Sequence, residues 1–294
     1  MSSLNTEATK LTDLELREAI IKTIAFFDLF DWPLTAREIK KNFAGRASLS
    51  EVIKLLDKEL GFNEETEEKK SAKVIDSQDG FYFLSGRSAI IAIRQQRYNY
   101  FVRKLKIARR FARVFSFFPF VQKVYLSNVI GSYNLRDGSD IDFLVVTTPQ
   151  RLWLSRLYCA GLAKILNRRP TPSYKRDTIC LSFYMSADYQ DWHDLRLIGD
   201  DPYFDYWRNN LVLLYNRDRQ YNFIKFLDKL GNLLEVAVKK LQLKIMPSYL
   251  RTAINNSDGV VVNDSVLKFY IHDRRREYAD KYAKKIQEIF SAIN

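Results

Sequence analysis

Two acidic residues near the middle of the chain have the types and spacing for metal chemistry. Asp140 and Asp142 stand two apart, directly before an apolar run at residues 143–146. Because side chains alternate faces along a strand, both carboxylates would point the same way. Two carboxylates facing one spot repel each other unless a cation neutralises them, and Mg²⁺ typically takes one or two carboxylates plus phosphate oxygens. The spacing predicts a metal site, although a turn with exposed acids before a buried strand would give the same pattern.

A turn of small and polar residues precedes this acidic pair. Gly131 and Ser132 are followed by a short, mostly polar segment and then by the run SDID, which begins at Ser139. This order resembles the signature of the polymerase-beta-like nucleotidyltransferase superfamily. The resemblance implies that Asp140 and Asp142 bind Mg²⁺ or Mn²⁺, which align an in-line displacement at the α-phosphorus of a nucleoside triphosphate (NTP). It also implies that Gly131, Ser132 and Ser139 contact the phosphates, as backbone N–H groups at a helix N-terminus do.

The length of this turn differs from the family pattern. Seven residues separate Ser132 from Asp140, whereas the family usually has a longer interval. The usual interval would instead place Asn128 and Val129 at the phosphate turn. Either the turn is shortened here, or the Gly-Ser pair is replaced and its presence nearby is a coincidence.

The third acidic residue of the family is also missing from its expected strand. Catalytic members supply another carboxylate from a later strand, and the run TICLSFYMS at 178–186 contains none. Asp177 and Asp188 flank that run, so only a strand end would bring either into the site. Two functions therefore stay open. One is Mg²⁺-dependent transfer of a nucleoside monophosphate from an NTP to an unknown acceptor. The other is a catalytically degenerate core that binds nucleotide or nucleic acid in a regulatory or scaffolding role.

The resemblance extends beyond this motif. Several runs look like those of an uncharacterised group of bacterial nucleotidyltransferase-domain proteins that carry an N-terminal winged-helix-like segment. These runs are FDLFDWPLT at 27–35, DGFYFLSGR at 79–87, RLWLSRL at 151–157 and TICLSFYMS at 178–186. They imply a shared architecture and establish no activity.

The N-terminal residues 1–86 have the element order of a winged helix. Apolar residues at helical spacing predict a first helix over 13–30, and capping boxes at Thr35 and Ser48 open two more. Short strands over 73–76 and 81–84 follow. Residues 1–79 hold 12 Lys/Arg against 16 Asp/Glu, a poor balance for phosphate contacts. This domain is therefore expected to bind a protein partner rather than DNA.

A basic connecting helix is expected within residues 87–120. Between Gly80 and Arg136, inclusive, the chain has eleven Lys/Arg and no acid. Such a helix either attracts a polyanion, such as nucleic acid, or presents a solvated basic face. The polyanion hypothesis rests on Arg103, Arg109, Arg110 and Arg113.

The remaining pattern predicts an α/β core over 121–216 and a helical region over 217–294. Strands are expected at 124–130, 140–147 and 178–186, with a helix over 150–167 between the last two. Helices are expected over 218–244 and 264–292. Together these elements predict an α+β protein with a small mixed sheet in the core.

Composition excludes some classes of protein. The chain has 47% hydrophobic residues, which is enough for packed cores and unlike a disordered protein. The first residues contain no apolar segment typical of a signal peptide, and no apolar run is long enough to span a membrane. Cys159 and Cys180, the only cysteines, lack the sequence spacing of a metal site. The pattern is typical of a cytoplasmic protein in a reducing compartment.

Overall fold

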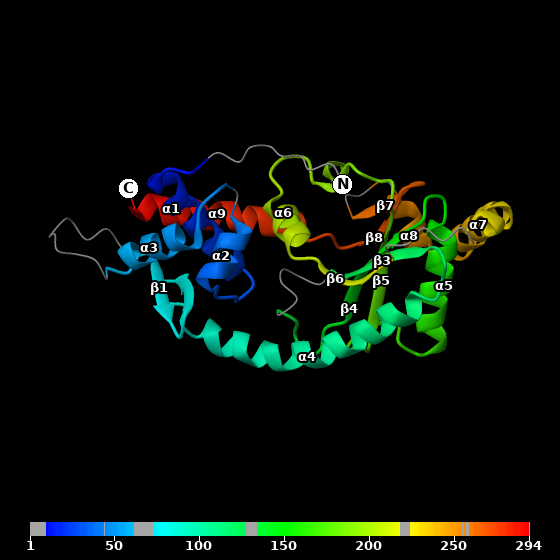
Figure 1. Cartoon of the computed structure of the whole chain (residues 1–294), viewed down its shortest axis with the longest axis horizontal. Coiled ribbons are helices and arrows are strands. Elements are labelled where there is room, and N and C mark those ends of the chain that lie inside the picture. Colours follow the sequence, from blue (N-terminus) through cyan, green and yellow to red (C-terminus); the bar gives the residue numbers. More distant parts are fainter. Residues whose placement is uncertain are drawn as a thin grey trace. The chain divides into compact units, whose positions relative to one another are not determined.

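The computed structural model is a mixed α and β structure with a mixed sheet, which confirms the predicted class at that level (Figure 1). The described residues are 10–43, 45–61, 73–127, 134–217, 224–254, 256 and 259–293. They divide into two compact units, Met1–Gln96 with Glu277–Asn294, and Arg97–Arg276. Within the described ranges, no helix combines the length and apolarity that a membrane span requires.

The first unit contains three helices followed by a two-stranded hairpin, in the predicted order. Each of these three helices opens with a capping box, in which the side chains of Thr12, Thr35 and Ser48 accept from backbone N–H groups three residues on. The hairpin strands pair antiparallel around the turn at Asp79 and Gly80, which both have positive φ. The elements are α1 (Asp13–Asp28), α2 (Ala36–Asn42), α3 (Leu49–Glu59), β1 (Ile75–Gln78) and β2 (Phe81–Leu84).

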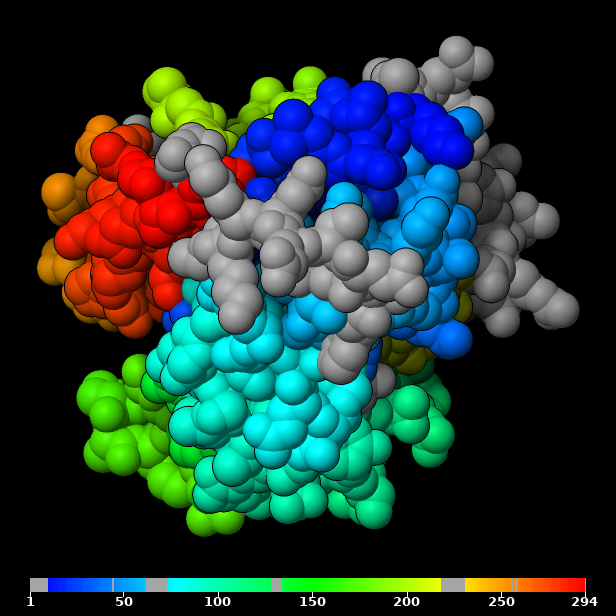
Figure 2. All heavy atoms as spheres, turned by 90° about the vertical axis from the view of Figure 1, so that its left-hand side faces the viewer, coloured from blue at the N-terminus to red at the C-terminus, as the bar shows by residue number. Residues whose placement is uncertain are grey.

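The C-terminal helix completes this unit, which the sequence pattern did not predict. Helix α9 (Arg275–Ile293) belongs to the first unit from Glu277 onward, and its atoms (red) adjoin those of α1 (blue) in Figure 2. Tyr282 meets the ring of Phe26 edge-on at 5.5 Å. Lys285 donates to the buried carboxylate of Asp28, which also accepts from Arg87 Nε at 2.9 Å. A fragment ending at residue 86 would lose all these contacts.

The second unit is built on a six-stranded sheet in the order β6-β3-β4-β5-β8-β7. Only β4 and β5 pair in parallel, and α5 forms the crossover between them; every other neighbouring pair is antiparallel. The three predicted strands correspond to β3, β4 and β5. The elements are α4 (Ile90–Phe115), which begins in the first unit, β3 (Val121–Leu126), β4 (Ile141–Thr147), α5 (Leu152–Ile165), β5 (Ile179–Ser186), a 3₁₀ turn (Trp192–Leu195), α6 (Pro202–Asn209), β6 (Val212–Asn216), α7 (Ile224–Ile245), α8 (Ser248–Ala253), β7 (Val260–Val262) and β8 (Val266–Phe269).

The C-terminal region corrects one expectation. The helix expected over 264–292 is wrong at residues 266–269, which form β8 and pair with β5. Strands β7 and β8 therefore belong to the sheet, and the region 217–294 is not purely helical. Strands β6, β7 and β8 are apolar runs of three to five residues. Periodicity alone cannot distinguish a strand from a helix in runs this short.

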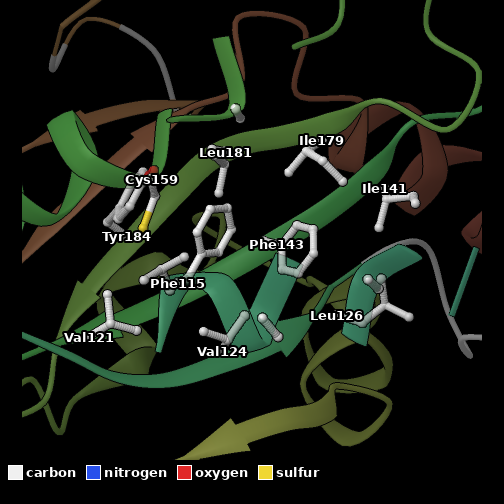
Figure 3. Close-up of a cluster of buried hydrophobic side chains, with 14 of the residues drawn as sticks. Phe115, Val121, Val124, Leu126, Ile141, Phe143, Cys159, Ile179, Leu181 and Tyr184 are labelled. Atoms are coloured by element: carbon white, nitrogen blue, oxygen red, sulfur yellow. The ribbon is translucent and has the colours of Figure 1, made fainter. Parts of the chain in front are cut away.

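Helices cover both faces of this sheet. On one face, apolar residues of α4 and α5 pack against the strands, and Figure 3 shows Phe115 and Cys159 beside Val124, Phe143 and Tyr184. On the other face, the 3₁₀ turn and α6 pack against residues of β4, β5 and β8. Alternate residues of β4 and β5 lie in the apolar layers on the two faces of the sheet. A polar side chain on either strand therefore points to one face or the other.

Candidate metal centre

The two predicted carboxylates lie at the start of the parallel strand pair. Asp142 on β4 pairs in register with Cys180 on β5, and Ile141 pairs with Ile179. Both isoleucines are buried in the α4–α5 layer (Figure 3). Since side chains alternate along a strand, Asp142 and Cys180 point to the opposite face, side by side.

Three ligand atoms converge at this point. One carboxylate oxygen each from Asp140 and Asp142 and the sulfur of Cys180 all lie within 4.8 Å of one another. All three side chains are partly exposed. Within the part of the chain that the structure describes, this is the only group of three or more acidic, cysteine or histidine residues with such geometry.

Cys180 is the site residue that the sequence pattern missed. Its distance from Asp142 along the chain hides the relation, because only parallel pairing of β4 with β5 brings the two together. One signal was present: Cys180 is the polar-facing residue between Ile179 and Leu181 at the start of an apolar strand. A strand predicted to pair with the acidic strand would have placed this thiol beside the carboxylates.

The electrostatics of the cluster reflect burial and mutual repulsion. Burial raises the pKa of Asp140, although its own backbone hydrogen bond and the charges of Lys175, Lys104 and Arg169 act in the opposite direction. Burial also raises the pKa of the Cys180 thiol, and the negative charges of Asp142 and Asp140 raise it further. Without a cation, Cys180 is therefore a neutral thiol at physiological pH.

The turn that precedes the acidic pair is anchored to α4. Lys104 is fully buried there, and its Nζ donates to the carbonyl of Ser139 at 2.6 Å and to Asp177 Oδ1 at 2.9 Å. Arg103 forms ion pairs with Asp177, at 2.9 Å, and with Asp137. Two cations of the basic helix thus hold the segment that presents Asp140. Arg103 is engaged in this structural role, although the sequence suggested a contact to a polyanion.

No third carboxylate joins the cluster among the described residues. Asp177 is bound to Lys104 and Arg103, and Asp188 accepts from Ser186. Among the predicted phosphate contacts, Ser139 donates its hydroxyl to the carbonyl of Arg136 at 2.9 Å. Gly131 and Ser132 lie outside the described residues.

Strand β3 and helix α6 border the site on the side away from β5. The backbone N–H of Ser127, just after β3, donates to the carbonyl of Asp142 at 2.9 Å. The indole of Trp207 on α6 donates to the carbonyl of Ser127 at 3.1 Å and stacks on Phe183. Burial raises the pKa of Tyr270 strongly, with a further contribution from the charge of Asp142, so its ring lies within electrostatic reach of the acids.

The carboxylates and the thiol of this cluster differ in the divalent cations that they suit. Two carboxylates are ligands that Mg²⁺ and Mn²⁺ accept, with phosphate oxygens or water in the remaining positions. A thiol is a poor ligand for Mg²⁺ and a good one for softer ions. The carboxylate pair alone is therefore sufficient for Mg²⁺, and Cys180 adds chemistry that Mg²⁺ does not use.

Comparisons with protein-family models, with curated proteins and with solved structures found no match for this chain.

Proposed function

We propose that this chain binds an NTP through a divalent cation held by Asp140 and Asp142, in a core of the nucleotidyltransferase type. The observation that carries the proposal is the convergence of both carboxylates on one point at the start of β4. Carboxylate pairs of this kind bind Mg²⁺ or Mn²⁺ together with phosphate oxygens. The resemblance of the run around Ser139 to nucleotidyltransferases supports a nucleotide as the source of those oxygens.

The residues around the pair have separate roles in this proposal. Asp140 and Asp142 hold the cation, which supplies positive charge for the phosphates when bound. Lys175 and Arg169, whose charges act on Asp140, are suited to attract the outer phosphate oxygens. Lys104 keeps the turn before Asp140 in place through the carbonyl of Ser139.

Binding without turnover fits the geometry better than catalysis. A nucleotidyl transfer needs the acceptor hydroxyl to lose a proton. The third side chain of the cluster, Cys180, is a thiol with a raised pKa. Asp177, just before β5, is held by two cations. Among the residues that the structure describes, the site therefore has no evident base, which favours a regulatory or scaffolding role.

Transfer of a nucleoside monophosphate is the second candidate. It is favoured by the retention of both carboxylates of the family's metal-binding motif, close enough together to share an ion. Incubation with labelled NTPs, Mn²⁺ and a cell lysate tests it. A labelled product that the wild type forms and the Asp140→Asn, Asp142→Asn double variant does not would favour turnover over binding alone.

Equilibrium dialysis tests the proposed binding. Labelled NTPs are offered to the full chain with and without Mn²⁺, and the double Asn variant is compared with Asp200→Asn. Asp200 is an exposed acid of the same unit, so its variant controls for the loss of negative charge. We expect Mn²⁺-dependent retention of nucleotide by the wild type and the control only. Equal retention by the double variant would overturn the proposal.

A polyanionic partner is proposed for the exposed side of α4. Lys106, Arg109, Arg110 and Arg113 are exposed on this helix and form no ion pair with any residue that the structure describes. Polyanion binding there should weaken steeply with salt because it releases counterions. Charge reversal at Arg109 and Arg110 should reduce it, and unchanged binding would indicate a solvated face.

The three helices and hairpin of the first unit are proposed to be a winged-helix-like docking module for a protein partner. Its third helix, α3, presents Lys54 and Lys58 but also Glu51 and Asp57, and Glu59 pairs with Arg17. Such a mixed surface suits a protein better than the phosphates of DNA. Tight, sequence-selective DNA binding by the full chain at physiological salt would contradict this.

A further inference from the structure

Three neighbouring strands place polar side chains in one row across the sheet. Leu126 of β3 pairs with Phe143 of β4, so the next residue of β3, Ser127, lies opposite Asp142, and the hydrogen bond from its N–H to the Asp142 carbonyl agrees with this register. On its other side, Asp142 pairs with Cys180. Because the described chain neighbours of these three residues lie in the α4–α5 layer, the row faces the opposite side of the sheet.

The hydroxyl of Ser127 is a second, independent observation at this position. Ser127 is only 7% exposed, and its Oγ has no hydrogen-bond partner among the described atoms. A buried hydroxyl without a partner is unfavourable, because it has lost its hydrogen bonds to water without replacing them. A water or oxygen ligand on a cation beside Asp142 would accept this hydrogen bond.

The composition of the cluster indicates which cation fits it. Two carboxylate oxygens and one sulfur within 4.8 Å of one another are a ligand set of the kind that Zn²⁺ accepts, with a fourth position for water or substrate. Thiolate ligands favour such softer ions over Mg²⁺. We infer that Asp140, Asp142 and Cys180 form a mixed oxygen–sulfur site that prefers Zn²⁺ or Co²⁺ to Mg²⁺. This inference rests on the proposed function in that both use the same carboxylate pair.

Coordination by Cys180 requires a change of protonation state. The thiol releases its proton to solvent, and the sulfur lone pair then forms the bond to the cation. Two carboxylates and a thiolate give a charge of −3, of which a divalent cation neutralises two. The charges of Lys175, Lys104 and Arg169, which act on Asp140, offset the remainder. Binding should therefore release one proton per ion that a site without Cys180 does not release.

Titration of the full chain with Co²⁺ tests the inference, because a cobalt–thiolate bond has a charge-transfer absorption that oxygen ligands do not give. The chain has two cysteines, so Cys159→Ala is the matched control for Cys180→Ser. Cys159 is buried in the core. We expect the charge-transfer band in the wild type and in Cys159→Ala, and its loss in Cys180→Ser. Where Cys159→Ala does not fold, the wild type against Cys180→Ser decides.

Affinity and proton release give a second readout. Loss of a group that only supports a ligand typically weakens metal binding about 10–100-fold, so Cys180→Ser should weaken Zn²⁺ binding by at least about 10-fold while leaving Mg²⁺ binding unchanged. Calorimetry in buffers of different ionisation enthalpy should show one proton fewer released by the variant.

The outcomes separate this inference from the proposed function. A wild-type chain that binds Co²⁺ without the charge-transfer band, or equal Zn²⁺ affinity in Cys180→Ser, would overturn the mixed site alone. If the Asp140→Asn, Asp142→Asn double variant bound Mn²⁺ as the wild type does, the proposed function would fail as well.

Discussion

The second unit contains two clusters of partly or fully buried acids, and the pKa shifts in these clusters have opposite signs. In the first, Asp273 accepts hydrogen bonds from Arg275 and from Lys268 of β8, and Arg275 also binds Asp201 at 2.8 Å. Burial raises the pKa of Asp273, but the hydrogen bonds from Arg275 and the charge of Lys268 outweigh burial and lower this pKa to about 2. In the second, at Asp140, burial prevails over the nearby cations and the pKa is raised.

From this difference we propose that the first cluster is structural and the second is a binding site. The charges around Asp273 are satisfied by side chains of the chain itself, in direct contact, so no ligand is needed. At the second cluster, one carboxylate oxygen each of Asp140 and Asp142 and the sulfur of Cys180 lie within 4.8 Å of one another. Perturbed acids that face one another in a partly exposed position are typical of functional sites. The following changes test that distinction, beginning with the largest expected effect.

Removal of Arg275 should destabilise the protein strongly. Arg275 and Asp201 are both buried, and Arg275→Met removes the cation that pairs with Asp201 and Asp273. Breaking a buried ion pair in this way typically costs about 3–5 kcal/mol. Chemical denaturation measures the loss. The control is Arg109→Met, which changes an exposed arginine and should alter stability by less than about 0.5 kcal/mol. Equal effects of the two changes would contradict the structural role of the Arg275 cluster.

Asp273 should make stability depend on pH in acid. Its pKa falls from 3.8 to about 2 on folding. The stabilisation, about 2 kcal/mol, is thus fully present above pH 4 and is lost as pH falls through about 2. The difference in unfolding free energy between wild type and Asp273→Asn should shrink over that range. A difference that stays constant from pH 5 to pH 2.5 would show that the charge of Asp273 is not the cause.

The acidic pair should behave in the opposite way. In metal-free protein, Asp140→Asn with Asp142→Asn removes the charge of Asp140, which burial disfavours, and the neighbouring charge of Asp142. We expect unfolding free energy to stay level or to rise slightly, on the order of 0.5 kcal/mol. A loss comparable to that of Arg275→Met, measured by denaturation in the presence of a chelator, would mean that these acids are structural.

Local signals were sufficient to predict much of this architecture. The capping boxes at Thr35 and Ser48 and the long apolar strand after Asp142 depend on neighbouring residues, so the sequence states them directly. The convergence of Asp140 and Asp142 also follows from the period of a strand.

Features that depend on pairing between distant segments could not be predicted. Cys180 joins the site only through the parallel pairing of β4 with β5, and β8 completes the sheet with a segment too short to show a period. Likewise, the sequence pattern suggests a polyanion contact for Arg103 and assigns no role to Lys104. Their role in holding the turn before Asp140 depends on Asp177, more than seventy residues away.

The central claim is that Asp140 and Asp142 bind a divalent cation, and calorimetric titration of the full chain with Mn²⁺, with and without an NTP, tests it most directly. The account predicts binding at one site, tighter with the NTP present because its phosphates complete the coordination. It also predicts an unfolding temperature that rises with Mn²⁺ concentration, and the loss of both responses in the double Asn variant but not in Asp200→Asn. Absence of Mn²⁺ binding by the wild type under both conditions would contradict the account and leave the acidic pair as a structural turn.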